Sequence, residues 1–297
     1  MSLSRDLLYL IARSPTLFLS LRNSAILNDI ISTGAATADD VANMITMAYN
    51  INPSATINIF SDQRITGPTA AAIFGSNYIQ PSTIAPLANV MPTSAATYAL
   101  ANIPTSKAAS ILNDPNMPAS TAVAILANSN LSATKGYSIL ANANMPGNTA
   151  QQILYNIVAN YSVSRAISLM TAGAQSVTLS ASATYNGVNV FNSLTTGSYT
   201  YTADGQPHIL IAGTLTVSSG GAISKTATGA AGPSAGNGTG GGFLIILTNS
   251  LNNSGTISAN GVNGNVCGGG TTVGGTGTML VVGSDVPGNG GSGGATI

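Results

Sequence analysis

The sequence contains no glutamate, no tryptophan, one histidine and one cysteine. Eight Lys and Arg residues balance eight Asp residues, and only 5% of the 297 residues are charged, against roughly a quarter in an ordinary globular protein. This balance provides no basic surface, so we expect no nucleic-acid partner. The wet surface must instead come from Ser, Thr, Asn, Gln and Gly, which suits a chain packed among copies of itself or one that works where carboxylates are a liability.

The scarcity of ligating side chains argues against a metal centre. Cys267 stands alone, which excludes an intrachain disulfide and a thiolate metal site within one chain. The neighbouring acids Asp39 and Asp40 have no His or Cys nearby. We therefore predict that they lie in the first turn of a helix capped by Thr37, where the helix dipole favours negative charge, and that no metal is bound.

The same scarcity argues against catalysis. Glycoside hydrolysis needs two carboxylates about 5 to 10 Å apart, and the second half of the chain has only Asp204 and Asp285. His208 lies beside an apolar run and has only Asp204 as a nearby acidic neighbour, so we interpret it as structural. The sequence predicts neither an enzyme nor a cofactor site.

The first 32 residues are apolar but carry charges at short intervals, at Arg5, Asp6, Arg13 and Arg22. These charges interrupt any run long enough for a membrane span or a signal-peptide core. The segment is typical of two amphipathic helices broken at Ser14-Pro15, and we predict no membrane span.

From residue 51 to about residue 161 the sequence repeats every 12 to 14 residues, as in MPTSAATYALAN, IPTSKAASILNDPN and MPASTAVAILANSN. In the last of these units, Pro118 suits a first helical turn, and Ser120 or Thr121 can cap its free amides. Asn128 is expected to end the helix in a left-handed conformation. Each unit therefore predicts a two-turn helix and a turn.

A helix of about eight residues is too short to be stable alone, so neighbouring units must stack. The pattern predicts an α-solenoid of short helical repeats, which ends after one more helix at Ser162–Met170. Of the 34 glycines, 28 lie after residue 176. We therefore predict two domains, a helical-repeat domain over 1–173 and a Gly-rich β domain over 174–297.

The second domain begins with runs of alternating Ser, Thr, Val and Tyr, which indicate half-buried strands. Apolar triplets then recur about every 35 residues, at 209–211, 244–246 and 280–282, and Ile223 and Ile257 occupy a matching later position. The recurrence predicts a β-solenoid, a right-handed β-helix, with a Gly-rich β-sandwich as the alternative. The predicted class for the whole chain is α+β.

Glycine-rich stretches separate these triplets, at 229–242, 267–277 and 288–297. No Gly-Lys-Ser or Gly-Lys-Thr completes a phosphate-binding loop. They are either plain surface loops or tips that present backbone donors and acceptors to a receptor. The candidate receptor-contact residues are Gly238, Thr239, Gly240, Gly269, Thr271, Gly275, Asn289 and Gly291.

The stretch TYTADGQPHILIAGTLTVSSGGAIS, together with GNGTGGGFLIILTNSLNNSGTISANGVNGN, resembles the Gly-rich tail-fibre and tail-spike proteins of archaeal spindle-shaped viruses from hot acidic springs. The resemblance covers about 90 residues and carries no catalytic motif. It implies an extracellular virion protein that attaches to the surface of the host.

We therefore expect a structural virion protein of the tail or terminal spike. Its helical repeats would dock on other tail or capsid proteins, and its Gly-rich domain would contact a host surface glycan or coat protein. Open ends of a short β array and charge-poor faces predict a homo-oligomer. The alternative is a subunit of an archaeal cell-surface filament, pilus or sheath.

Overall fold

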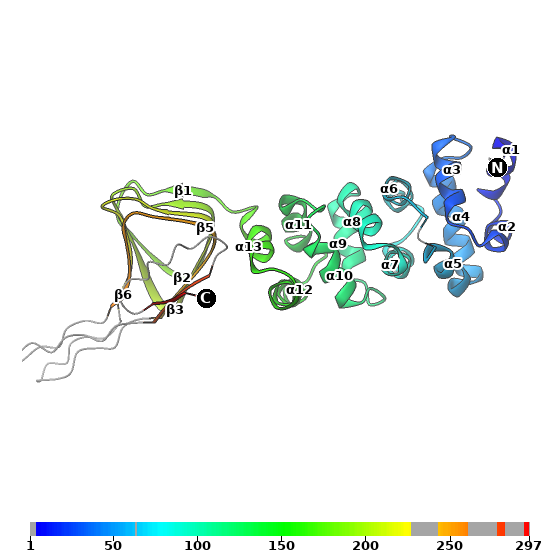
Figure 1. Ribbon diagram of the computed structural model, residues 1–297. Coiled ribbons are helices and arrows are strands. Elements are labelled where there is room, and N and C mark those ends of the chain that lie inside the picture. The colour runs from blue at the N-terminus through cyan, green and yellow to red at the C-terminus, as the bar shows by residue number, and fades with distance from the viewer. Residues whose placement is uncertain (1–3, 63, 227–242, 261–277, 283–293, 297) are drawn as a thin grey trace, which may run out of the picture. The chain divides into compact units, whose positions relative to one another are not determined.

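The computed structural model describes residues 4–62, 64–226, 243–260, 278–282 and 294–296. The chain divides into two compact units, Met1–Ser162 and Val163–Ile297. The described part of the first unit is built from helices, and that of the second combines one helix with a sheet (Figure 1).

The structure describes thirteen helices. They are α1 (Arg5–Ile11), α2 (Pro15–Leu21), α3 (Ala25–Ser32), α4 (Ala38–Ile51), α5 (Pro53–Phe60), α6 (Gly67–Gly75), α7 (Pro81–Val90), α8 (Thr93–Asn102), α9 (Thr105–Leu112), α10 (Ala119–Ala127), α11 (Ala133–Leu140), α12 (Gly147–Asn160) and α13 (Val163–Thr171).

From α4 to α12, helices pack against the next helix but one, as in the pairs α6 with α8, α7 with α9 and α10 with α12. The Ala and Ile-Leu positions of the repeat form the interior, with Ala122, Ile125 and Leu126 of α10 at most 1% exposed. Burial of these aliphatic faces stabilises helices that are too short to persist alone. The last helix, α13, lies in the second unit and packs on the sheet, although the sequence assigned it to 1–173.

The repeat ends its helices differently from the sequence prediction. Asn128 has φ −66° and ψ 129°, an extended conformation, so the predicted left-handed cap is wrong. Its side-chain oxygen instead accepts a hydrogen bond from the amide of Asn130 at 2.9 Å, and Asp114 and Asn142 do the same two residues before Asn116 and Asn144. These side chains build turns by bonding the backbone two residues on.

The structure describes eight strands in the sheet of the second unit. They are β1 (Ser176–Thr178), β2 (Ala183–Thr195), β3 (Thr200–Val217), β4 (Ala222–Thr226), β5 (Phe243–Asn253), β6 (Thr256–Asn260), β7 (Thr278–Val282) and β8 (Gly294–Thr296).

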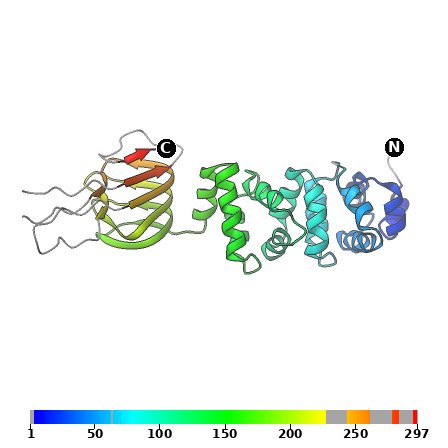
Figure 2. The ribbon, with the colours of Figure 1, turned by 90° about the horizontal axis from the view of Figure 1, so that it is seen from below.

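All the strand pairs are parallel, in the order β1-β2-β3-β5-β7-β8, and β4 joins β3 to β6 in the same sheet. The sheet curves into a nearly closed barrel, and Figure 2 shows its strands lying side by side. The chain is thus an α/β fold. The predicted α+β class, a helical solenoid followed by a β-solenoid or sandwich, is wrong. The polar segments that were expected to separate short strands lie within long strands, β2 and β3, and all the described strands belong to one sheet.

The strand register also corrects the sequence. Leu244 pairs with His208, and Ile245 with Ile209, so the middle triplet is offset by one residue from its predicted alignment, whereas Ile209 and Leu280 both align with Ile245. A slip of one residue moves a side chain to the opposite face of a sheet. The structure places Leu244 and His208 in the interior together. The predicted match of Ile223 with Ile257 is confirmed.

Glycine lets successive strands stack closely at one corner of the barrel. A Cβ on Gly255 would lie 2.3 Å from the carbonyl oxygen of Gly221, and a Cβ on Gly221 would lie 2.3 Å from that of Gly197. Real Cβ atoms do not approach backbone oxygens so closely, so larger residues would force the corner apart.

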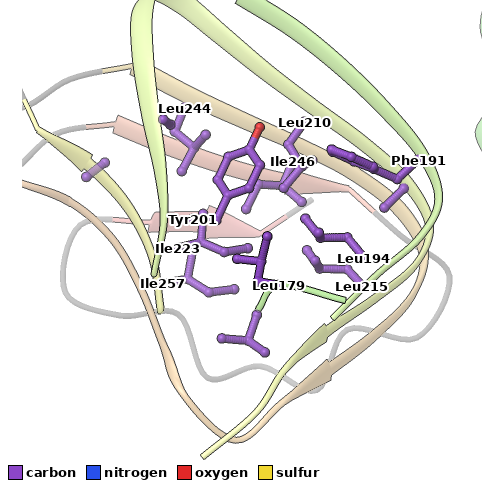
Figure 3. Close-up of a cluster of buried hydrophobic side chains, with 14 residues drawn as sticks. Leu179, Phe191, Leu194, Tyr201, Leu210, Leu215, Ile223, Leu244, Ile246 and Ile257 are labelled. Atoms are coloured by element: carbon purple, nitrogen blue, oxygen red, sulfur yellow. The ribbon is translucent and has the colours of Figure 1, made fainter. Parts of the chain in front are cut away.

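Aliphatic and aromatic side chains fill the barrel (Figure 3). The buried side chains include Leu194, Leu210, Leu215, Ile223, Leu244 and Ile246, all fully buried, and Tyr201. Because this interior is packed, any polar group within it needs a partner from the protein or from a ligand.

Candidate functional site

Three ionisable side chains lie inside the barrel, Tyr201 and His208 of β3 and Lys225 of β4, and each is fully buried. The Tyr201 hydroxyl and His208 Nε2 are 2.9 Å apart. His208 Nδ1 lies 2.9 Å from the backbone oxygen of Asp204. His208 therefore contacts the backbone of Asp204.

These contacts fix the tautomer of the histidine. A carbonyl oxygen can only accept, so Nδ1 of His208 carries a proton and donates it to Asp204. Burial lowers the pKa of His208, and the nearby charge of Lys225 lowers it further, although the contacts with Asp204 act in the opposite direction. In the neutral ring Nε2 accepts the hydrogen bond that the Tyr201 hydroxyl donates.

Two aromatic rings pack against the ring of Tyr201. The Tyr185 ring stacks on Tyr201 with a centroid distance of 4.3 Å, and the Phe191 ring meets Tyr185 edge-on at 5.9 Å. Burial raises the pKa of Tyr201, with a smaller contribution from Tyr185. Tyr201 therefore stays protonated at neutral pH and acts as a hydrogen-bond donor, not as a base.

Lys225 lies in a row of small residues. It pairs with Ala203 on one side and Ala259 on the other, and both alanines are nearly buried. Two short side chains in register leave the long Lys225 chain room inside the sheet. The Nζ atom of Lys225 is buried and has no hydrogen-bond partner in the structure.

The candidate receptor-contact residues Gly238, Thr239, Gly240, Gly269, Thr271, Gly275, Asn289 and Gly291, and also Cys267, lie outside the described residues. The structure does show where two of the Gly-rich segments begin and end. Thr226 pairs with Asn260, and Phe243 with Thr278. Segments 227–242 and 261–277 therefore leave and rejoin the sheet at neighbouring strand ends.

The predicted acidic pair in the helical unit caps a helix, as the sequence indicated. The Thr37 side chain accepts from the amide of Asp40, and the Asp40 carboxylate accepts from the amide of Thr37, which closes a capping box at α4. Hydrogen bonds from Thr37 lower the pKa of Asp40, with a smaller contribution from Arg13, which lies 3.3 Å away. Asp39 lies in the same first turn.

Within the described ranges, no group of three or more His, Cys, Asp or Glu side chains comes together to hold a metal ion. No helix in the same ranges is both long and apolar enough to cross a membrane.

The sequence reasoning missed Lys225 and Tyr201. A signal was present at Lys225, because the run AISKT places Lys225 two residues after the interior Ile223, on the same face of the strand. Comparison with protein-family models, curated proteins and solved structures gives no match.

Proposed function

We propose that the protein is a structural component of a virion tail or terminal spike that attaches to the host surface through its Gly-rich segments. The observation that carries this proposal is the position of the two longest connections of the sheet. Ala203 pairs with Lys225 and His208 with Leu244, so residues 205–207 and residues 227–243 connect equivalent points of neighbouring strands. One connection has three residues and the next has seventeen.

The short connection shows that the sheet itself needs only a few residues at this corner. The two connections that follow, 227–243 and 261–278, are much longer than closure of the barrel requires. Their extra length therefore has another role. Long Gly-rich segments supply backbone donors and acceptors without charged side chains. This composition suits contact with a neutral or acidic host glycan or coat protein.

The exterior of the helical unit supports its role in assembly. Most of the exposed large apolar side chains belong to this unit, among them Leu7, Tyr9 and Leu10 of α1 and Tyr155 and Val158 of α12. Gathered apolar side chains on a surface mark contacts with other proteins. The helical repeats would dock on neighbouring tail or capsid proteins, or on further copies of the chain in a homo-oligomer.

The test replaces the two long connections with the short one already present in the sheet. Residues 227–243 and 261–278 are each replaced by Gly-Gln-Pro, the connection between Asp204 and His208. We expect the variant to keep its melting temperature and to lose binding to isolated envelopes of thermoacidophilic archaea in a sedimentation assay. Unchanged binding by a folded variant would contradict attachment through these segments.

Localisation gives an independent check. Mass spectrometry and immunogold labelling of purified virions should find the protein as a minor component at one end of the particle. Its presence on uninfected cells, and not in virions, would favour the cell-surface filament instead.

A further inference from the structure

Lys225 places an ammonium group in the interior of the sheet unit. Its side chain is fully buried and its Nζ atom has no hydrogen-bond partner. An unpaired charge in a protein interior is strongly unfavourable, whereas the same charge held by an anion is stable. A lysine at such a position is therefore expected to be stabilised by an anionic partner.

Among the described residues of the second unit, no acidic side chain is hydrogen-bonded to this ammonium group. This unit contains two aspartates, Asp204 and Asp285. Asp204 follows Ala203, the interior neighbour of Lys225, and successive side chains of a strand point to opposite faces. Asp285 lies outside the described residues.

The remaining polar groups near the lysine are donors or are already engaged. The hydroxyl of Tyr201 donates to Nε2 of His208, and Nδ1 of His208 donates to Asp204. The site thus offers an ammonium with three unused protons beside a neutral Tyr-His pair. Such a site selects a group that only accepts hydrogen bonds and carries negative charge, such as a carboxylate or a sulfate.

An aromatic side chain lies two strands away from Lys225 in the register of the sheet. Tyr185 pairs with Ala203, and Ala203 pairs with Lys225, so two strand spacings, about 10 Å, separate the Tyr185 and Lys225 positions. Tyr185 is only partly buried and stacks on Tyr201. Such a partly buried ring offers a flat apolar face on which a sugar ring can pack.

We propose that Lys225 anchors a subsite for the carboxylate or sulfate group of an acidic sugar, with the partly buried ring of Tyr185 beside the sugar. The assignment rests on the proposed function, since it names the chemical class of the host receptor. Its defining contact is the charge-assisted hydrogen bond from Nζ of Lys225 to the anionic group.

The test compares wild-type protein with Lys225→Met, Lys225→Arg and Ser224→Ala. Methionine keeps the length of the side chain without its charge, and Ser224, the neighbour on the opposite face of β4, provides the matched control. The probes are glucuronate, glucose 6-sulfate, neutral glucose and inorganic sulfate, studied by calorimetry and thermal melting. We expect both acidic sugars to bind to wild type and Ser224→Ala, to bind at least tenfold more weakly to Lys225→Met, and neutral glucose not to bind.

The unliganded variants provide a second readout. Without anions, Lys225→Met should melt at a higher temperature than wild type, because it removes an unpaired buried charge. If Lys225→Met does not fold, Lys225→Arg must retain acidic-sugar binding. Failure of both sugars to bind wild type, equal binding by Lys225→Met, or binding of inorganic sulfate alone would overturn the proposal.

The two proposals can fail separately. If Lys225→Met sediments with envelopes as wild type does while the Gly-Gln-Pro variant does not, attachment stands and the Lys225 subsite is wrong. If the Gly-Gln-Pro variant still binds envelopes while Lys225→Met loses acidic sugars, the subsite stands and attachment through the Gly-rich segments is wrong.

Discussion

The lysines of the two units differ in their hydrogen bonding. In the helical unit the half-buried lysines serve the backbone: Lys135 donates to the carbonyl oxygen of Ile103 at 2.7 Å, and Lys107 donates to that of Ser76. Each oxygen lies at the C-terminal end of a helix, where positive charge is favourable. In the sheet unit the buried Lys225 has no such bond.

The comparison separates structural from functional use of the same residue type. Lys107 and Lys135 stand 28 positions apart in matching repeats and connect one helix to the end of an earlier one. Their role follows from the repeat. Lys225 donates no such bond to the backbone, so its burial requires a different explanation.

The helical unit should be most sensitive to charge in its apolar interior. Leu126→Asp places a carboxylate at a fully buried position on α10, and we expect a loss of about 4 kcal/mol in the free energy of unfolding. Denaturant melts followed by circular dichroism would measure it. Ser129→Asp, at an exposed turn position, is the control and should cost under about 0.5 kcal/mol. Equal costs would mean that the helix faces are wrongly assigned.

The sheet unit should be most sensitive at its stacked corner. Gly255→Ala forces a Cβ against the backbone oxygens of Gly221 and Ser218, so we expect a cost of about 3 kcal/mol. The matched change Gly147→Ala, in the first turn of α12, meets no atom within 4 Å and should stabilise by up to about 0.5 kcal/mol. A neutral Gly255→Ala would contradict the close stacking of the corner.

The sequence was informative where local rules govern the structure. The repeat predicted the short helices, and Thr37 predicted a helix cap with the acidic pair in the first turn. The recurring aliphatic residues predicted the pairing of Ile223 with Ile257. The sequence was misleading about the arrangement of the strands, which depends on contacts between residues far apart in the chain. Alternation along β2 and β3 reveals strands, but the same alternation fits a stack, a sandwich or a barrel.

The candidate site shows the same limit. A lone His208 is visible in the sequence, but its neighbours depend on register: one residue of slip would have moved Leu244 off the interior row. Tyr201 precedes a register shift and His208 lies within it, because β3 has four residues between Asp204 and Ile209 where β2 has only Gly187 between Asn186 and Val188. No spacing rule in the sequence specifies that shift.

A charge-removal pair tests the contrast between the lysines directly. Lys135→Met deletes hydrogen bonds to Ile103 and Thr105 at a partly exposed position, and we expect it to destabilise the protein by about 1 kcal/mol. Lys225→Met in anion-free buffer should shift the melting temperature in the opposite direction. The same sign for both variants would remove the distinction between a structural and a binding lysine.

Acid should affect the two units through different groups, and its effects should be smaller than those of the substitutions. In the helical unit, hydrogen bonds from Thr37 and Arg64 lower the pKa values of Asp40 and Asp62. A lowered carboxyl pKa gives stability that is present above the unfolded value, near 3.8, and is lost as pH falls through the folded value. Both groups are close to the surface, so little stability depends on them.

In the sheet unit the pKa of His208 is lowered by burial, so the unfolded chain binds a proton more readily than the folded chain. Stability from this group is complete above the unfolded value of 6.5 and declines as pH falls toward the folded value. We expect the melting temperature to decline gently below that pH, and His208→Phe to flatten this decline while it leaves the Tyr201 hydroxyl unpaired.

These small effects predict an acid-resistant fold. Protonation of all eight aspartates leaves a net charge of +8 from Lys and Arg, or +9 with His208, which is modest for 297 residues. We therefore expect the circular-dichroism spectrum and the oligomeric state to persist at 25 °C from about pH 7 to about pH 2. Amide hydrogen exchange at each pH would assign any loss to one unit, and light scattering would follow assembly. A cooperative unfolding transition between about pH 5 and pH 3 would contradict this prediction, because it would require many paired carboxylates that this chain does not possess.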